Sequence, residues 1–247
     1  MTTAGDSAAD GSKAADSKAT DAKAADSKAT DAKATDSKAT DAKAADSATD
    51  YAALDPHARD VLDFWFGVPD SDGFGKPRSP WFNGGAKLDG QLRERFGALH
   101  DAACGGACDR WAATPLGALA LIVVLDQFSR NIHRGTPRAF AADAKALAHA
   151  RDVVAAGWDA RLPSVYHRAF VYLPFEHDES RDSQREAVRL FALLKDLDAG
   201  CDGYHDYALR HAAVIERFGR FPHRNAILGR ASTDEEAAFL REPRSSF

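Results

Sequence analysis

The sequence predicts an all-α protein of about eight helices in antiparallel pairs, arranged as a helical repeat or bundle behind a disordered tail. From residue 51 onward, apolar residues recur at helical spacing, and proline or glycine stands where these segments start and stop. No segment alternates between polar and apolar residues as a strand ladder would. These observations favour an all-α fold built from short connections between neighbouring helices.

The tail comprises residues 1–50, and residues 51–247 are expected to form one domain. Residues 11 to 50 repeat a five-residue unit of Ala or Thr, Asp, Ser or Ala, Lys and Ala. A period of five fits neither a helix face nor a strand face, so this segment buries too little apolar area to fold. Residues 1–50 hold seven Lys and ten Asp, a net charge of −3, which argues against a nucleic-acid-binding arm. We expect a flexible spacer.

Helix starts are marked by a capping residue followed by proline, as in Asp55-Pro56, Thr114-Pro115 and Thr136-Pro137. The fifth helix is expected to end at Leu173-Pro174, because proline disfavours a helical conformation in the residue before it. Residues Ser232 to Glu235 resemble a capping box that opens the last helix. The expected helices cover about residues 56–66, 87–103, 115–126, 137–156, 164–173, 182–197, 203–218 and 233–241.

Composition excludes several classes of protein. The net charge is −5 for the whole chain, which leaves −2 outside the tail, so no overall field selects nucleic acid as a partner. No apolar run approaches the roughly 18 residues that span a bilayer, and the N-terminus lacks the apolar core of a signal peptide. We therefore expect a cytoplasmic protein that does not bind membranes. Three cysteines, Cys104, Cys108 and Cys201, fit reduced thiols, and no cofactor is expected.

Two polar motifs follow apolar helices at similar offsets. The first follows an apolar run and holds Asp126, Gln127, Phe128, Arg130, Asn131, His133 and Arg134. The second, ninety residues later, repeats an acid, Phe, Arg, His and Arg at matched positions. Its members are Glu216, Phe218, Arg220, His223 and Arg224, followed by Asn225. A motif that occurs twice indicates one helix-plus-corner unit used twice.

Two interpretations of these corners stay open. Asp126 with Arg130, and Glu216 with Arg220, are four residues apart and can form structural ion pairs on one helix face. Alternatively, the corners meet around a small anionic ligand, and proton-transfer groups lie beside it. The predicted ligand-binding residues are Asp126, Gln127, Arg130, Asn131, Arg134, Arg220, Arg224 and Asn225, and the predicted catalytic residues are Glu176, His177 and His223.

The anion-pocket hypothesis fits acid–base or hydrolytic chemistry on a phosphate or carboxylate compound, without a recognisable Ser or Cys nucleophile. A metal set of Asp126, Glu176, His177 and His223 is conceivable but lacks the spacing of zinc-binding helices, so no metal is predicted. Other histidines, including His100 and His211, are expected to be surface or core residues. The alternative is a non-catalytic module that binds a partner protein in a groove.

Four motifs together resemble the bacterial family named domain of unknown function 924. The resemblance covers about Pro56 to Glu242. Its motifs are Val61 to Gly67, Leu125 to Thr136, Leu173 to His177 and Arg217 to Asn225. It implies an all-α fold similar to the tetratricopeptide-like superfamily, and it implies no activity. The chain departs from the family pattern at Ser129 and His133, which leaves His177 and His223 as the better catalytic candidates.

Overall fold

Two helices begin where a capping residue precedes proline, as the sequence predicts, namely Pro56–Phe66 and Pro115–Ile122. The predicted helix start at Thr136-Pro137 is wrong, because Thr136 forms no capping bond, Pro137–Phe140 is a 3₁₀ helix, and the α-helix after it begins at Asp143. The computed structural model describes residues 50–243 and 245, so the predicted tail up to residue 49 lies outside the described residues. Asp55 Oδ1 accepts a hydrogen bond from the backbone N–H of His57 at 2.9 Å, and Thr114 Oγ1 accepts one from Gly117 at 3.2 Å. Each side chain therefore satisfies a backbone donor that the first helical turn leaves without a partner.

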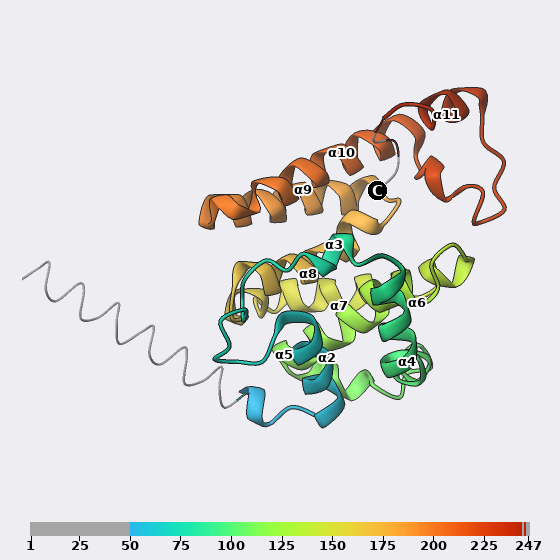
Figure 1. The fold of residues 1–247 in the computed structure, drawn as a ribbon. Helices are drawn as coiled ribbons and strands as arrows, with labels where there is room; N and C mark the ends of the chain where they lie inside the picture. The colour runs from blue at the N-terminus through green and yellow to red at the C-terminus, as the bar shows by residue number, and fades with distance from the viewer. Residues whose placement is uncertain (1–49, 244, 246–247) are drawn as a thin grey trace, which may run out of the picture. The chain divides into compact units, whose positions relative to one another are not determined.

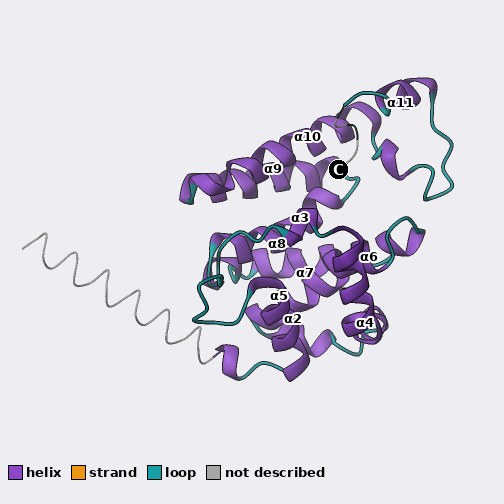
Figure 2. Ribbon diagram, in the orientation of Figure 1, coloured by secondary structure: helices purple, strands orange, loops and turns teal. Residues whose placement is uncertain are grey.

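The described part of the chain holds ten α-helices, α2 to α11, and no strand (Figures 1 and 2). The all-α prediction is confirmed, and the two helices beyond the expected eight are the four-residue α3 and α6. The helices are α2 Pro56–Phe66, α3 Pro80–Asn83, α4 Gly85–Cys104, α5 Pro115–Ile122, α6 Ser129–Ile132, α7 Asp143–Ala155, α8 Val165–His177, α9 Arg181–Leu197, α10 Asp202–Phe218 and α11 Asp234–Phe239.

Helix α5 forms the centre of the main apolar core. All eight of its residues are buried, and it contacts α2, α7 and α8. Trp81 is buried and donates its indole N–H to the Trp65 carbonyl at 2.8 Å, so it attaches the segment before α4 to this core. Its neighbour Phe82 is 61% exposed.

A wider turn joins α5 to α6. Val123–Phe128 forms a π-helix, in which each backbone bond spans one residue more than in an α-helix. All six of its residues are buried, including Asp126 and Gln127. Polar side chains of the first motif therefore enter the interior from a helical backbone rather than from a loop.

The predicted end of the fifth helix at Pro174 is wrong. Helix α8 continues through Pro174 to His177. The proline lacks an N–H and costs about 3 kcal/mol in a helix interior, but Leu173 and Phe175 on either side of it are buried in the core. Burial of such side chains stabilises by about 1.5–3 kcal/mol each and outweighs the local preference. Glu176 and His177 therefore lie in the last turn of α8.

Helices α9 and α10 lie side by side, and α9 also packs against α8 (Figure 1). Helix α11 starts with a capping box, but Thr233 and Glu236 form it, one residue later than predicted. A second, smaller apolar cluster joins the end of α10 to α11. Its buried members are Val214, Ile215 and Phe221. No described helix is both long and apolar enough to cross a bilayer.

Candidate functional site

Asp126 and His177 form a buried dyad between the π-helix and the end of α8. His177 Nδ1 lies 2.8 Å from Asp126 Oδ1, and Gln127 Nε2 donates to the other carboxylate oxygen at 2.6 Å. Burial alone would raise the pKa of Asp126, but Arg130 and His177 hold it well below its ordinary value. Burial and then Arg130 lower the pKa of His177. The neutral His177 therefore donates its Nδ1–H to a charged carboxylate, which leaves the lone pair on Nε2.

Arg130 links this dyad to Asp143 at the start of α7. Its Nη1 lies 2.9 Å from Asp126 Oδ1, and its two terminal nitrogens donate to the two oxygens of Asp143 at 3.0 Å each. Burial would lower the pKa of Arg130, but the two carboxylates raise it. The predicted ion pair between Asp126 and Arg130 is confirmed, and Arg130 forms a second ion pair with Asp143.

Arg224 is a buried cation with incomplete pairing. Its guanidinium carbon lies 4.7 Å from the Phe140 ring centre and 4.6 Å from that of Phe221. The nearest carboxylate contact is Arg224 Nη1 to Asp143 Oδ2 at 3.6 Å, and that carboxylate already accepts two bonds from Arg130. Its buried Nε–H has no acceptor within the described residues. Burial, then Arg130, lowers the pKa of Arg224 to about 10.

Glu176 lies on the other side of the dyad beside His211 of α10. Its Oε1 is 3.0 Å from His211 Nδ1, and its buried Oε2 has no hydrogen-bond partner in the part of the chain described. Burial and then the charge of Asp126 raise the pKa of Glu176 to about 8, and burial lowers the pKa of His211 to about 3. Both groups are therefore neutral near pH 7. His223 is also neutral, because burial and then Arg224 lower its pKa to about 4.

These side chains form one electrostatically connected group, which we call the Asp126 cluster. Its members are Asp126, Arg130, Asp143, Glu176, His177, His211, His223 and Arg224.

Some members of the cluster are accessible to solvent and others are buried. The side chains of Arg130, Asp143 and His177 are 19%, 20% and 14% exposed. Those of Glu176 and Arg224 are 4% and 8% exposed. The incompletely paired groups are therefore the least exposed ones.

Other predicted ligand-binding residues of the first motif have partners of their own. Arg134 donates to both oxygens of Asp89 at 2.6 and 2.9 Å, and to Asn131 Oδ1 at 3.0 Å. Asn131 in turn donates to the Gln127 carbonyl at 2.9 Å. The structure therefore places Gln127 beside the dyad, whereas Asn131 and Arg134 form a separate network with α4.

The predicted ion pair between Glu216 and Arg220 is wrong. Arg220 instead donates to both oxygens of Glu236 at 2.6 and 2.7 Å, and Glu216 lies 3.2 Å from Arg181. Helix α10 ends at Phe218, and Gly219 takes a left-handed conformation with φ of 69°. Because Arg220 follows that break, it no longer shares a helix face with Glu216.

The idea of one helix-plus-corner unit used twice is also wrong. The first motif remains helical from the π-helix into α6, whereas the second leaves its helix at Gly219. Asn225 of the second motif donates to Ser232 and Glu236 at 3.0 and 3.3 Å, beside α11. Only His223 and Arg224 bring the second motif to the Asp126 cluster.

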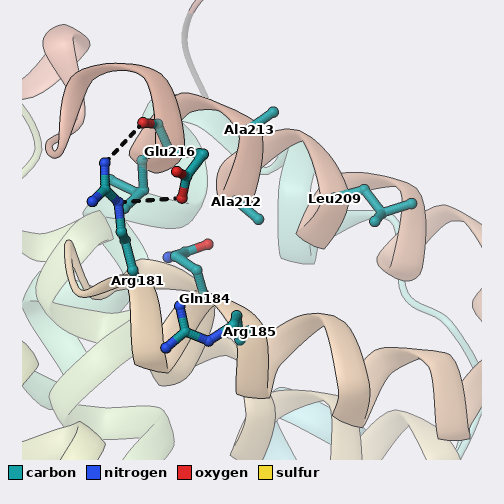
Figure 3. A pocket seen from close by; sticks show the side chains of 8 residues that line it. Arg181, Gln184, Arg185, Leu209, Ala212, Ala213 and Glu216 are labelled. Atoms are coloured by element: carbon teal, nitrogen blue, oxygen red, sulfur yellow. Dashed lines mark hydrogen bonds and ion pairs between the residues drawn. The ribbon is translucent and has the colours of Figure 1, made fainter.

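A groove lies elsewhere, between α9 and α10 (Figure 3). It has a volume of about 330 Å³, and its floor includes the small side chains Ala212 and Ala213. Arg181 bonds to Glu216 at one end, and Leu209, which is 46% exposed, lines the groove on α10. The remaining lining residues are Gln184, Arg185 and Ile215.

The comparisons with known proteins agree with this fold. The model of a family described as bacterial proteins of unknown function, DUF924, matches residues 61–244. The chain belongs to this family. A solved structure of a protein of unknown function from Agrobacterium tumefaciens is similar, with 37% sequence identity and a TM-score of 0.64. The match covers 75% of this chain and 97% of that one. No curated protein sequence matches. The tetratricopeptide-like architecture stays a prediction.

Three residues of the site in this DUF924 chain were not predicted from its sequence. Asp143 accepts from Arg130, His211 contacts Glu176, and Phe140 packs on Arg224. Asp143 is the first residue of α7, where an acid usually stabilises the helix terminus, so its sequence position gave no sign of a second role. His211 lies at helical spacing among apolar residues, a pattern typical of a core histidine.

Proposed function

We propose that the Asp126 cluster binds the carboxylate or phosphate group of a small molecule, and that His177 and Glu176 transfer protons to and from it. Arg224 carries the proposal. A buried guanidinium that lacks a carboxylate within hydrogen-bond distance is costly, since removing an ion from water costs several kcal/mol. An anion beside Arg224 and Arg130 would supply the missing acceptor.

An added anion can be balanced by one added proton. Arg130 and Arg224 are cations, Asp126 and Asp143 are their counter-ions, and the cluster has no net charge while His177 is neutral. When an anion binds, its field raises the pKa of His177 and favours an imidazolium next to Asp126. Anion binding is therefore expected to draw a proton onto His177.

The same arrangement supports acid–base chemistry. His177 Nε2 can accept a proton, because Nδ1 is held by Asp126, which would stabilise the imidazolium that forms. Glu176, whose pKa is raised to about 8, can donate a proton near neutral pH. None of the eight residues of the Asp126 cluster has a hydroxyl or thiol group, so the nucleophile in a hydrolytic reaction would be water.

The test is thermal unfolding with inorganic phosphate or acetate at constant ionic strength. We compare the parent protein with Arg224→Gln and with Arg217→Gln, which removes an exposed arginine paired with Glu235. At 100 times the dissociation constant, a ligand stabilises by about 2.7 kcal/mol, or roughly 5–10 °C for a domain of this size. The parent and Arg217→Gln are expected to show this shift, and Arg224→Gln is expected to lose it.

A second measurement addresses the proton. The His177 pKa, followed by NMR, should rise when phosphate is added to the parent and stay constant in Arg224→Gln. The proposed site would be refuted if an anion stabilised the parent and Arg224→Gln equally. It would also be refuted if neither phosphate nor acetate stabilised the parent.

The groove between α9 and α10 supports a second candidate, the binding of a partner protein. Exposed Leu209 and the small residues Ala212 and Ala213 offer an apolar floor, and Arg185 at its edge suits an acidic side chain of the partner. A photo-crosslinking amino acid at position 209 tests this, with position 197, an exposed leucine outside the groove lining, as the matched control. One discrete crosslinked product with the label at position 209, and none with the label at position 197, would support partner binding in the groove. Equal amounts of crosslinked product from the two positions would count against it.

A further inference from the structure

A second group of ionisable side chains lies on the opposite side of the first motif, where α4 meets α6. Over residues 50–243 and 245, one set of metal-ligating side chains offers ligand atoms that all lie within 4.8 Å of one another: His100, Asp101 and His133. None of these residues belongs to the Asp126 cluster.

The hydrogen bonds of Ser129 fix the tautomer of His100. Ser129 Oγ donates its only hydrogen to the Leu125 carbonyl at 2.6 Å, because a carbonyl oxygen can only accept. His100 Nε2 lies 2.7 Å from the same Oγ and must therefore be the donor in that contact. The Nδ1 atom of the neutral ring is left with its lone pair, 3.7 Å from Asp101 Oδ1. This is the pattern of a metal-binding histidine, which usually donates its other ring N–H to a protein acceptor.

His133 brings a second imidazole to the same place. The two ring centres are 5.0 Å apart, and the buried Nε2 of His133 has no hydrogen-bond partner within the described residues. Imidazole nitrogens are the commonest metal ligands in proteins.

We propose that His100 Nδ1, His133 and Asp101 bind one divalent transition-metal ion, with Zn²⁺ as the best match. Two imidazoles and one carboxylate are borderline donors that suit Zn²⁺, and three protein ligands leave a fourth position for water. Zn²⁺ binds nitrogen at about 2.0–2.1 Å, so ligand atoms around it lie closer together than 4.8 Å. The Asp101 side chain is 64% exposed and can move to close that distance.

The surroundings set limits on this site. Arg138 bonds to Asp101 Oδ1 at 2.7 Å and competes with the ion, but both side chains are more than 60% exposed, where such a pair contributes little. The Cys104 thiol lies 3.9 Å from His100 Nδ1. Cys104 does not belong to the group whose ligand atoms all lie within 4.8 Å of one another, so it is not assigned as a ligand.

The experiment titrates untagged, chelator-treated full-length protein with Zn²⁺ by calorimetry and with Co²⁺ by visible absorption. We expect one ion per chain and the intense bands of four-coordinate Co²⁺. His133→Ala and Asp101→Asn should each weaken binding at least tenfold. Ser129→Ala, which removes the acceptor for His100 Nε2, should weaken it by about 10–100-fold.

Two variants serve as controls. His205→Ala removes a half-buried histidine on α10, and Cys104→Ser removes the neighbouring thiol, so both should bind Zn²⁺ as the parent does. Thermal unfolding of each variant without metal checks that it is folded. No 1:1 binding up to millimolar Zn²⁺, or unchanged binding in folded His133→Ala, would overturn the proposal. Retained binding in His133→Ala would place the ion elsewhere, for example in the Asp126 cluster. Neither result of the metal titration changes the outcome expected for the phosphate experiment, because the two sites share no residue.

Discussion

Replacing Glu176 by glutamine is expected to remove most of the pH dependence of stability between pH 6.5 and 8. The folded protein raises the pKa of this carboxyl from its ordinary value of 4.5 to about 8, through burial and the charge of Asp126. Between those two values the folded chain holds a proton that the unfolded chain has lost. The contribution of Glu176 is therefore fully present below pH 4.5 and is lost as pH rises through about 8.

The magnitude follows from the size of the shift. Each pH unit between the two pKa values changes the free energy of unfolding by about 1.4 kcal/mol, so the range from pH 6.5 to 8 accounts for about 2 kcal/mol. Buried histidines have the opposite effect on the pH dependence of stability. Burial lowers the pKa of His211 to about 3, so its contribution to stability is lost as pH falls below the ordinary histidine value of 6.5. Stability should therefore be greatest near pH 6.5.

The assay is urea unfolding of the parent and Glu176→Gln at several pH values from 6.5 to 8. Glutamine matches the shape of the neutral acid, so the two proteins should be similarly stable only below pH 4.5. The variant should be about 3 kcal/mol more stable than the parent at pH 6.5, and about 5 kcal/mol more stable at pH 8. Glu186→Gln is the control, because Arg189 lowers the pKa of that surface carboxyl and it stays charged throughout. If the parent and Glu176→Gln lose stability equally between pH 6.5 and 8, the assignment of a neutral Glu176 is wrong.

Three further substitutions test other parts of the structure by calorimetry or denaturant unfolding. Asp126→Asn removes the charge shared by its arginine and histidine partners and should cost about 3–5 kcal/mol, or roughly 10 °C in Tm, whereas an unchanged Tm would contradict the buried pairing. Arg224→Met should leave the anion-free protein as stable as the parent or stabilise it by about 1–4 kcal/mol, and a loss of several kcal/mol would show that the guanidinium is already well paired. Gly117→Ala should destabilise by about 1–3 kcal/mol, because a Cβ there collides with the Trp111 carbonyl oxygen, while Gly90→Ala, which meets nothing within 4 Å, should stabilise by about 0.4–1 kcal/mol. Equal effects of the two glycine changes would contradict the packing at the start of α5.

Local signals in the sequence predicted most helix positions. Asp55 and Thr114 cap their helices as expected, because a capping bond depends on residues two or three apart. Pro174 was misassigned, because its effect depends on how much apolar surface α8 buries, which a local pattern does not reveal. The capping box was placed one residue early, because both Ser232 and Thr233 have the required side chain and only the backbone of α11 distinguishes them.

The candidate site was predicted only in part, for a physical reason. Clusters of ionisable residues at helix ends indicated Asp126, Arg130 and His177, since charges next to apolar helices need partners. The partners themselves come from distant segments. Asp143 and His211 reach the site through tertiary packing, and neither has a sequence neighbour that would distinguish it from a helix-terminal acid or a core histidine.

Arg220 and Arg224 show why the site depends on tertiary structure and why it suits an anion. They are four residues apart in one motif, yet Arg220 donates two hydrogen bonds to Glu236, whereas Arg224 has its closest carboxylate at 3.6 Å. The faces of Phe140 and Phe221 each contribute about 0.5–2 kcal/mol to Arg224, less than the several kcal/mol that burial of a cation costs. The remaining cost is a free energy that an anion can recover on binding. The incompletely paired guanidinium of Arg224 therefore both lowers the stability of the anion-free protein and provides affinity for an anion. A substitution that removes the guanidinium should raise that stability and abolish anion binding.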